Sequence, residues 1–338
     1  MLGFFLGVYD RLLINFIENK KLIFITTKNI DYIRNMQEVK ILEKYAKNVK
    51  IVYSNKKKYF GRILEIWKKL IQINIQDIDV IFIGFAPQLI LPLFRWKFKK
   101  KIIIIDFFIS VYDTLVHDRK KFRDKGIIAK LCHSIDSYTL KHANYVIADT
   151  KADAKYFIEE FHSDKSKFET LYLEADQIIY YPREQQKKEE LQNKFVVLYF
   201  GSILPLQGVD VVLDAIRMLK DEQDIFFQII GPIPEKYNKP IQQNVEYIEW
   251  LSQEELAQYI ANADLCLAGH FSGEIDKAKR TIPGKAYIYA AMGKKMILGK
   301  NEANLELYNA SNKKISYVEM GNSKVLAENV LINRNRIM

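Results

Sequence analysis

The 338-residue chain has only two cysteines, Cys132 and Cys266, and no apolar run long enough to cross a bilayer. Two cysteines in different halves of the chain fit neither a metal-binding spacing nor a disulfide framework. We expect both to be buried thiols in a reducing compartment. The first 17 residues are apolar and aromatic, but Asp10 and Arg11 interrupt them and no basic segment precedes them, so we expect no signal peptide.

Internal repeats and long flexible linkers are also lacking. The chain is 49% hydrophobic and 13% aromatic, which is enough for a sizeable core and argues against global disorder. At this length two domains are expected. The polar run 183–194 follows Pro182, so we predict domains at residues 1–182 and 183–338.

Positive charge is unevenly placed along the chain. Residues 1–190 hold 34 basic residues against 24 acidic ones, which accounts for the whole net charge of +10, and the remaining 17 of each sign cancel. Basic clusters lie at 56–58, 95–101 and 119–125. Such a surface suits nucleic acid, an anionic membrane or a phosphorylated lipid, or it reflects a lysine-rich composition. Because no nucleic-acid recognition module is present, we expect no nucleic-acid partner.

The opening residues form an apolar stripe when they are wound as a helix: Leu2, Phe5, Leu6, Tyr9, Leu13 and Phe16. This stripe suits a membrane interface, packing on its own domain, or contact with a twin subunit. A peripheral membrane position and a homodimer are therefore both open.

Strands and helices alternate in both halves, which predicts doubly wound parallel sheets of the α/β class. In the first half we expect strands at 22–26, 49–53, 80–84, 101–106 and 145–149, with helices at 32–46, 60–73, from 87, at 127–142 and at 152–161. In the second half we expect strands at 195–200, 225–231, 265–269 and 296–299, with helices from 208, at 256–263 and at 285–292. Thr150 and Ser252 are expected helix caps.

Two strands of the second half end in glycine turns, at Gly201 and Gly231. Ligands of open parallel sheets bind at the carboxyl ends of strands, where turns and helix N-termini expose backbone N–H groups. Further on, the segment 276–289 places cations around a proline-initiated helix, where they suit a diphosphate: Lys277, Lys279, Arg280 and Lys285. Lys277 and Lys279 also fit a solvated surface.

These motifs resemble family-4 glycosyltransferases of the GT-B fold, in a subset of bacterial polysaccharide enzymes. The segments that resemble the family read YFGSILPLQGVD at 199–210, IIGP at 229–232, DKAKRTIPGK at 276–285, AMGK at 291–294 and IIDFFISVYDT at 104–114. The resemblance implies two Rossmann-like domains facing across a cleft, with an acceptor-binding first domain and a nucleotide-sugar-binding second domain. It also implies retaining, hexosyltransferase-like transfer without a metal or other cofactor, because cations and backbone amides stabilise the leaving diphosphate.

The resemblance also assigns candidate site residues. The donor-binding set is Gly201, Ser202, Ile203, Gly231, Lys277, Arg280 and Lys285, with Arg280 and Lys285 expected on the diphosphate. The catalytic candidates, at or after the end of one strand, are Asp106, Asp113 and Asp118. One of the three is expected to orient the acceptor or to act as a base, although Asp113 also fits a helix cap.

The chain departs from the family pattern at four places. Ser202 and Gln207 stand where the wider family has an arginine and a lysine, and Arg280 and Ile288 stand where it has two glutamates. The subset carries an arginine at the position of Arg280, whereas Ile288 cannot accept a hydrogen bond from a ribose hydroxyl.

The expected partners are a UDP-, GDP- or dTDP-sugar donor and a glycan or lipid-linked acceptor, at a cytoplasmic or peripheral membrane location. The alternatives are a non-catalytic GT-B subunit that binds a partner transferase or glycoprotein, and a sugar-nucleotide epimerase.

Overall fold

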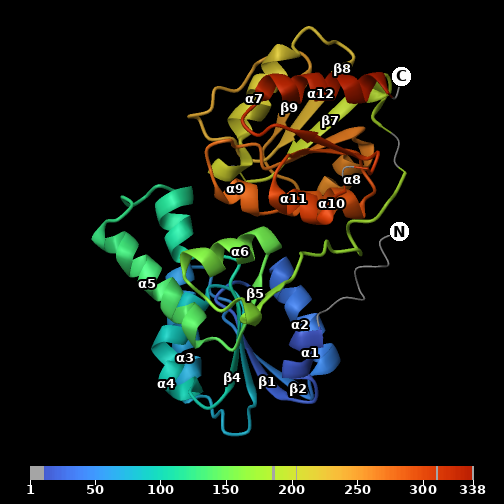
Figure 1. Ribbon diagram of the computed structural model, residues 1–338. Helices are drawn as coiled ribbons and strands as arrows, with labels where there is room; N and C mark the ends of the chain where they lie inside the picture. The colour runs from blue at the N-terminus through green and yellow to red at the C-terminus, as the bar shows by residue number, and fades with distance from the viewer. Residues whose placement is uncertain (1–10, 185–186, 203, 310, 337–338) are drawn as a thin grey trace. The chain divides into compact units, whose positions relative to one another are not determined.

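The structure is a computed structural model that describes residues 11–184, 187–202, 204–309 and 311–336. The chain divides into two compact units between Glu174 and Ala175, whereas the sequence suggests a boundary after Pro182. Each unit contains one six-stranded sheet with helices on both faces (Figure 1). This confirms the predicted α/β fold class with doubly wound parallel sheets.

The first unit has the strand order β2-β1-β3-β4-β5-β6, with all neighbours parallel. Its strands are β1 (Lys21–Ile25), β2 (Asn48–Val52), β3 (Val80–Ile83), β4 (Ile102–Asp106), β5 (Tyr145–Ala148) and β6 (Phe168–Thr170). Its helices are α1 (Arg11–Ile17), α2 (Ile33–Tyr45), α3 (Tyr59–Gln72), α4 (Leu91–Phe98), α5 (Ile127–His142) and α6 (Lys151–Glu160).

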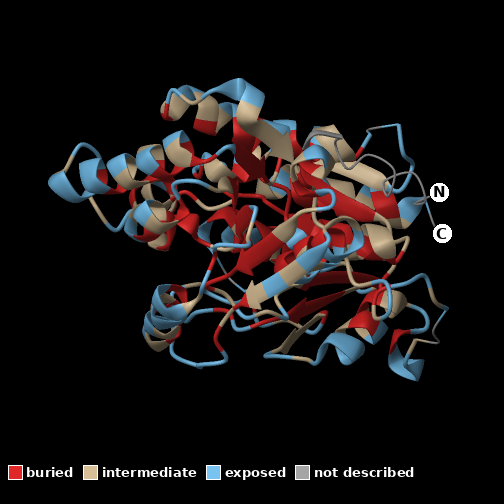
Figure 2. Cartoon of the chain, turned by 90° about the horizontal axis from the view of Figure 1, so that it is seen from below, coloured by how far each residue is buried: buried red, intermediate tan, exposed pale blue. Residues whose placement is uncertain are grey.

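The central strands of this sheet are apolar throughout because both of their faces are covered (Figure 2). Ile23 and Ile25 of β1 face α3, α4, α5 and α6, and the alternate residues Leu22 and Phe24 face α1 and α2. The helix expected from Pro87 begins as a 3-10 turn, Pro87–Leu89, before α4. This difference has a local cause, because the residue before that proline, Ala86, has a left-handed backbone (φ 53°).

The second unit has the order β12-β11-β10-β7-β8-β9, again parallel. Its strands are β7 (Phe195–Phe200), β8 (Ile225–Ile230), β9 (Val245–Ile248), β10 (Leu265–Gly269), β11 (Met296–Gly299) and β12 (Ile315–Val318). Its helices are α7 (Val209–Met218), α8 (Gln253–Asn262), α9 (Lys277–Arg280), α10 (Gly284–Ala291), α11 (Glu302–Leu307) and α12 (Ser323–Asn335). Helices α7 and α12 pack side by side on one face of the sheet.

The two predicted helix caps are confirmed. The Thr150 hydroxyl accepts a hydrogen bond from the backbone of Asp153, and Ser252 forms a capping box with Glu255. In the part of the chain that the structure describes, no helix is both long and apolar enough to span a membrane.

Candidate functional site

The strand order of the second unit locates its ligand-binding edge. Starting from β7, the chain adds β8 and β9 on one side and then returns to add β10, β11 and β12 on the other. The topological switch point therefore lies between β7 and β10, and ligands of such sheets bind at the carboxyl ends of the strands there. Strand β7 leads into Gly201, and β10 ends at Gly269. The glycine turn predicted at Gly201 thus lies beside the switch point.

Glycines allow close backbone packing at this edge. Gly231 has φ +125°, and a Cβ added to it would lie 2.3 Å from the carbonyl oxygen of Gly201. Gly208, the N-cap residue of α7, has φ +63°, and a Cβ there would lie 2.4 Å from the backbone nitrogen of Ser272. Neither position accommodates a side chain without a shift of the backbone. The loops after β7, β8 and β10 therefore converge on one place.

The ammonium group of Lys285 lies at the switch point. Lys285 is in the first turn of α10, is only 5% exposed, and donates a hydrogen bond to Oε1 of Gln207 at 2.5 Å. Its Nζ lies 3.9 Å from the ring centroid of Tyr199. A Cβ added to Gly201 would be 3.4 Å from Nζ, and one added to Gly269 would be 3.7 Å from it. The ammonium thus lies between the ends of β7 and β10.

Burial lowers the pKa of Lys285 well below its ordinary value, because desolvation disfavours the charged form. Within the described residues no carboxylate lies at ion-pair distance from its ammonium, which has only an amide oxygen and an aromatic ring as partners. Helix α10 begins beside it at Pro283 without a side-chain cap. An uncapped helix N-terminus next to a buried cation is a favourable place for a phosphate group.

His270, directly after β10, is a further member of this site that sequence reasoning missed. Its Nδ1 lies 3.2 Å from the carbonyl oxygen of Thr281, and the side chain is buried. Burial, and then the charges of Lys285 and Lys277, lower its pKa to about 3, so the ring is neutral at physiological pH. Its only sequence signal is a polar residue at the end of an apolar strand.

The remaining donor-side candidates lie on short segments around this cluster. Lys277 and Arg280 are both half-buried on α9. Lys279 on the same helix is exposed and forms an ion pair with Asp276 at 2.7 Å. Ser202 is exposed, and Ile203 lies outside the described residues.

The first unit has its own switch point, between β1 and β3. Three partly buried rings meet there: Tyr32 and Phe85 are 5.9 Å apart between centroids, and Phe85 and Phe108 are 5.5 Å apart. The ammonium of Lys28 lies 5.5 Å from the Phe85 ring, and Thr27 donates a hydrogen bond to the carbonyl of Phe85 at 2.9 Å. Aromatic faces beside a cation are suited to an amphipathic ligand. Sequence reasoning did not identify this cluster.

Asp106, a catalytic candidate, is part of a buried ion pair at the end of β4. Arg34 donates to both of its oxygens, from Nε at 2.6 Å and from Nη2 at 2.8 Å. Arg34 also reaches Asp149 at 3.1 Å and the carbonyl of Leu171 at 2.9 Å. Desolvation works against the charge of Arg34, but the two aspartates raise its pKa overall. Both oxygens of the Asp106 carboxylate are thus bonded to Arg34, which offers a structural explanation for this residue beside the predicted catalytic one.

Asp113 and Asp118 lie on a π-helical turn after β4, Asp113–Asp118, and both are buried. The segment that leads into this turn is held by Asp136 of α5, which sequence reasoning missed. Its carboxylate accepts hydrogen bonds from the Ser110 hydroxyl at 2.7 Å, from the Tyr112 backbone at 2.8 Å, and from Gln88 at 2.9 Å. Its burial raises its pKa.

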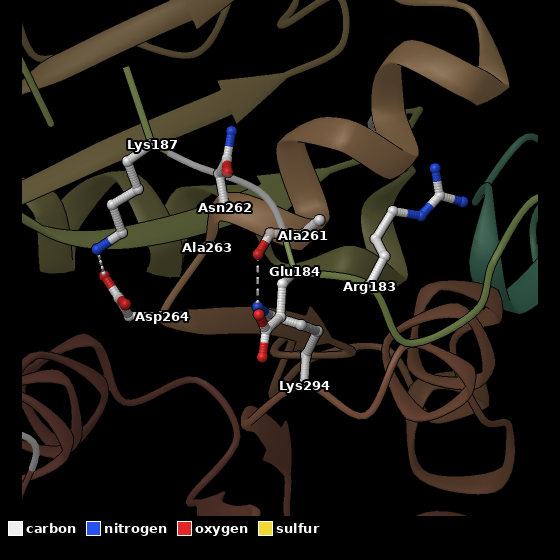
Figure 3. Close-up of a pocket in the computed structure, with 8 residues that line it drawn as sticks. All are labelled: Arg183, Glu184, Lys187, Ala261, Asn262, Ala263, Asp264 and Lys294. Carbon is white, nitrogen blue, oxygen red and sulfur yellow. Dashed lines mark hydrogen bonds and ion pairs between the residues drawn. The ribbon is translucent and has the colours of Figure 1, made fainter. Parts of the chain in front are cut away.

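A cavity of about 530 Å³ lies at the opposite, amino end of the second sheet (Figure 3). Lys187 forms an ion pair with Asp264 across it, and Lys294 donates to the carbonyl of Ala261 at 2.9 Å. Both lysines are therefore already bonded to other residues that line the cavity. Among the described residues, no group of three or more His, Cys, Asp or Glu side chains is placed to hold a metal ion.

Comparison with known proteins gives matches that agree with this arrangement. Residues 181–273 match the family model described as "Glycosyl transferases group 1". An uncharacterized 41.2 kDa protein in the cps region of Klebsiella pneumoniae is 24% identical over 206 residues, covering 59% of this chain and 55% of that protein. The chitobiosyldiphosphodolichol beta-mannosyltransferase of Kluyveromyces lactis is 24% identical over 277 residues, covering 70% of this chain and 59% of the enzyme. The chain thus spans a little over half the length of these curated relatives.

Among solved structures, HepE of Anabaena in complex with UDP superposes with a TM-score of 0.64 at 14% identity, over 94% of this chain and 91% of that one. The same protein has also been solved with UDP-glucose. A likeness at this identity establishes the fold, and both sheets are part of it because almost the whole chain is covered. The chain therefore has the GT-B fold, and its second unit carries the sequence match to the group 1 glycosyl transferases.

Proposed function

We propose that the protein is a glycosyltransferase that moves a sugar from a nucleotide-sugar donor to a glycan or lipid-linked acceptor in surface polysaccharide or glycoconjugate biosynthesis. We further propose that it acts with retention at the anomeric carbon and without a metal. The observation that carries the proposal is the buried ammonium of Lys285, which lies at the switch point of the unit that matches the group 1 family. The cps-region relative supports a role in polysaccharide biosynthesis, the mannosyltransferase relative supports the class of reaction, and the UDP complexes of a structural neighbour support the class of donor.

On the donor side, the reaction needs groups that stabilise the negative charge that develops on the leaving diphosphate. Lys285 and Arg280 are the proposed cations, with Lys277 nearby and the amides of Ser202 and Ile203 assisting. Because the His270 ring is neutral, it adds no further positive charge, and one of its nitrogens already faces Thr281. The two glycines Gly201 and Gly231 leave the backbone at the strand ends free of side chains.

On the acceptor side, we assign the binding surface to the first unit. Its aromatic cluster of Tyr32, Phe85 and Phe108 lies at the switch point and offers apolar faces to a sugar ring or to a lipid-linked group. Asp113 and Asp118 are the better candidates for orienting the acceptor hydroxyl or accepting its proton, because Asp106 already neutralises Arg34.

Nucleotide binding tests the donor site directly. Isothermal titration with UDP, GDP and dTDP in the presence of EDTA should show micromolar or tighter binding of one of them. Arg280→Ala should weaken that binding about tenfold or more, because a hydrogen bond to a charged group contributes about 1.5–3 kcal/mol. Lys279→Ala is the matched control, since it removes an exposed neighbouring cation of the same helix that is already paired with Asp276. Equal affinity of the Arg280 variant and the wild type would refute this assignment.

One observation favours a second candidate function, a non-catalytic GT-B subunit that binds a partner transferase or a glycoprotein. Ile288 on α10 stands where the wider family has a glutamate for the ribose, and its side chain offers no acceptor. A subunit of this kind should bind none of the three nucleotides in the same titration. If the protein binds one of the three nucleotides and also forms that nucleotide from the corresponding nucleotide sugar during turnover, it is an enzyme instead.

A further inference from the structure

Helix α5 presents an apolar face to solvent in addition to the apolar face that it buries. Ala129, Cys132 and Leu140 are buried on its inner side. On the opposite side, exposed apolar residues recur at helical spacing: Ile127 (88% exposed), Ile128 (46%), Leu131 (58%) and Tyr138 (38%). We call these four residues the α5 stripe. A helix of a globular domain normally has a polar outer face, so this stripe needs an explanation.

Positive charge gathers at the end of the α5 stripe. The segment 119–131 holds six basic residues against the single acid Asp124, and all six are exposed: Arg119, Lys120, Lys121, Arg123, Lys125 and Lys130. The one carboxylate is already engaged by the hydroxyl of Tyr112 at 3.2 Å. The loop and the first turns of α5 project from the body of the first unit (Figure 1), and this projecting tip is coloured as exposed in Figure 2.

The neighbouring helix adds to this surface. Helix α4 packs beside α5 and exposes Trp96 (73%) and Leu93 (51%), followed by the exposed Lys99 and Lys100. Tryptophan and lysine at the edge of an apolar surface are typical of segments that lie in a bilayer interface.

We propose that the α5 stripe and its basic loop form a docking surface for an anionic phospholipid membrane. Apolar side chains at the tip would enter the boundary between headgroups and acyl chains, and the basic loop would lie against the anionic headgroups. A second copy of the chain suits this surface less well, because a twofold contact over the stripe would bring a loop of net charge +5 from each copy into one interface.

This surface differs from the one suggested by the opening residues of the chain. Leu13 is 5% exposed and Ile17 is fully buried, and both belong to the core of the first unit. The ring of Phe16 packs on that of Tyr145, with the two ring centroids 5.5 Å apart. The described part of the stripe predicted over residues 2–16 therefore packs on its own domain. The rest of that stripe lies outside the described residues.

Docking through α5 would also place the proposed acceptor side close to lipid. Asp136 in the middle of α5 is hydrogen-bonded to the loop after β4 and to Gln88 after β3. Helix α5 is thus fixed to the loops at the carboxyl ends of the two strands nearest the proposed acceptor surface. The inference rests on the proposed function for this link alone, because the membrane contact itself does not require a transferase.

Vesicle co-sedimentation of the full chain tests the proposal, with vesicles of phosphatidylglycerol and phosphatidylcholine compared with pure phosphatidylcholine. The wild type should bind the anionic vesicles and should bind more weakly at high salt. The double variant Lys120→Gln/Lys121→Gln should lose about 25-fold in partitioning, at about fivefold per lysine. Ile127→Ser/Leu131→Ser should lose about tenfold or more at both salt concentrations.

Matched controls lie in residues 191–338 of the second unit, which carry no net charge, where Lys220→Gln/Lys236→Gln and Ile241→Ser change exposed residues of the same types. They should bind vesicles as the wild type does. Thermal unfolding of each variant checks that it is folded, and titration with the nucleotide in the absence of vesicles tests the donor site separately. If neither the wild type nor any variant binds a nucleotide, the proposed transferase function is refuted, but the vesicle result still stands.

Two results would overturn the membrane proposal. The first is a wild type that does not sediment with anionic vesicles at low salt, or stripe variants that sediment as well as the wild type. The second is light scattering that shows a dimer for the wild type and a monomer for Ile127→Ser/Leu131→Ser, which would mean that a second copy covers the stripe.

Discussion

Replacing Lys285 with methionine should stabilise the free protein and impair nucleotide binding at the same time. The substitution keeps the length of the side chain and removes its charge, which is buried because the residue is only 5% exposed. The hydrogen bond to Gln207 and the contact with the Tyr199 ring are lost. The lowered pKa of Lys285 shows that these two partners do not make up for its desolvation.

The direction of the stability change follows from proton binding. The pKa of Lys285 in the folded protein is lower than its ordinary value of 10.5, so the unfolded chain binds this proton more tightly. Stability of the wild type should therefore rise with pH between the lowered pKa and 10.5, and the full penalty is present below that range. At neutral pH we expect Lys285→Met to raise the free energy of unfolding by about 1–2 kcal/mol, as when other buried charges are replaced by apolar groups.

Binding of a nucleotide diphosphate should change in the opposite direction. An anion beside the ammonium favours its charged form and raises its pKa, so binding above the lowered pKa should take up a proton. Calorimetry in buffers of different ionisation enthalpy, repeated at several pH values up to 10.5, measures that uptake. Lys285→Met should abolish the uptake and weaken binding about tenfold or more.

The matched control is Lys294→Met, because Lys294 also has a pKa lowered by burial but lies at the other end of the sheet, where it bonds the carbonyl of Ala261. This variant should bind the nucleotide as the wild type does. If Lys285→Met instead loses several kcal/mol of stability and keeps both affinity and proton uptake, then Lys285 is a structural residue and the diphosphate binds elsewhere.

Two further predictions concern the structural supports of the two sites. Gly208→Ala should cost about 2 kcal/mol or more in urea denaturation, because φ is +63° and the new Cβ would lie 2.4 Å from the Ser272 nitrogen, whereas Gly284→Ala, with open space around it, should change stability by less than about 1 kcal/mol. Asp106→Asn should cost about 3–5 kcal/mol in the same assay, because it leaves the buried Arg34 short of its main counter-charge. A loss below about 1 kcal/mol for Asp106→Asn, combined with loss of transfer activity, would instead favour a catalytic role for this carboxylate.

Much of the fold could be predicted because the central strands are covered on both faces. A strand buried in this way is a continuous apolar run, and the predicted limits of Phe195–Phe200 and of the α5 helix, Ile127–His142, agree with the structure. The edge strands β6, β9 and β12 were missed. They are short and half-exposed, so polar residues such as Glu169 and Glu246 interrupt the apolar pattern.

The site was predictable only where its residues lie in local motifs. The glycine turn at Gly201 and the helix start before Lys285 are visible in the sequence. The partner of Lys285, Gln207, is 78 positions away, and the partner of Asp106, Arg34, is 72 positions away. Contacts at such separations depend on strand order, which a single sequence does not reveal. For this reason Asp106 was predicted as a catalytic candidate, although its burial against Arg34 gives it a structural explanation.

Three cations are buried among the described residues, Arg34, Arg62 and Lys285, and the first and last of them differ in a way that bears on function. Arg34 has carboxylates of Asp106 and Asp149 within hydrogen-bond distance, and these raise its pKa. Lys285 has no carboxylate at ion-pair distance among the described residues, and its pKa falls. A charge that is buried for stability is usually given a counter-charge or several acceptors: Arg34 has its carboxylates, and Arg62 donates twice to the carbonyl of Lys56. A buried charge without one is costly unless a bound anion supplies it. That difference favours an anionic ligand at the switch point of the second unit. The ion pair between Arg34 and Asp106 at the end of β4 needs no such ligand.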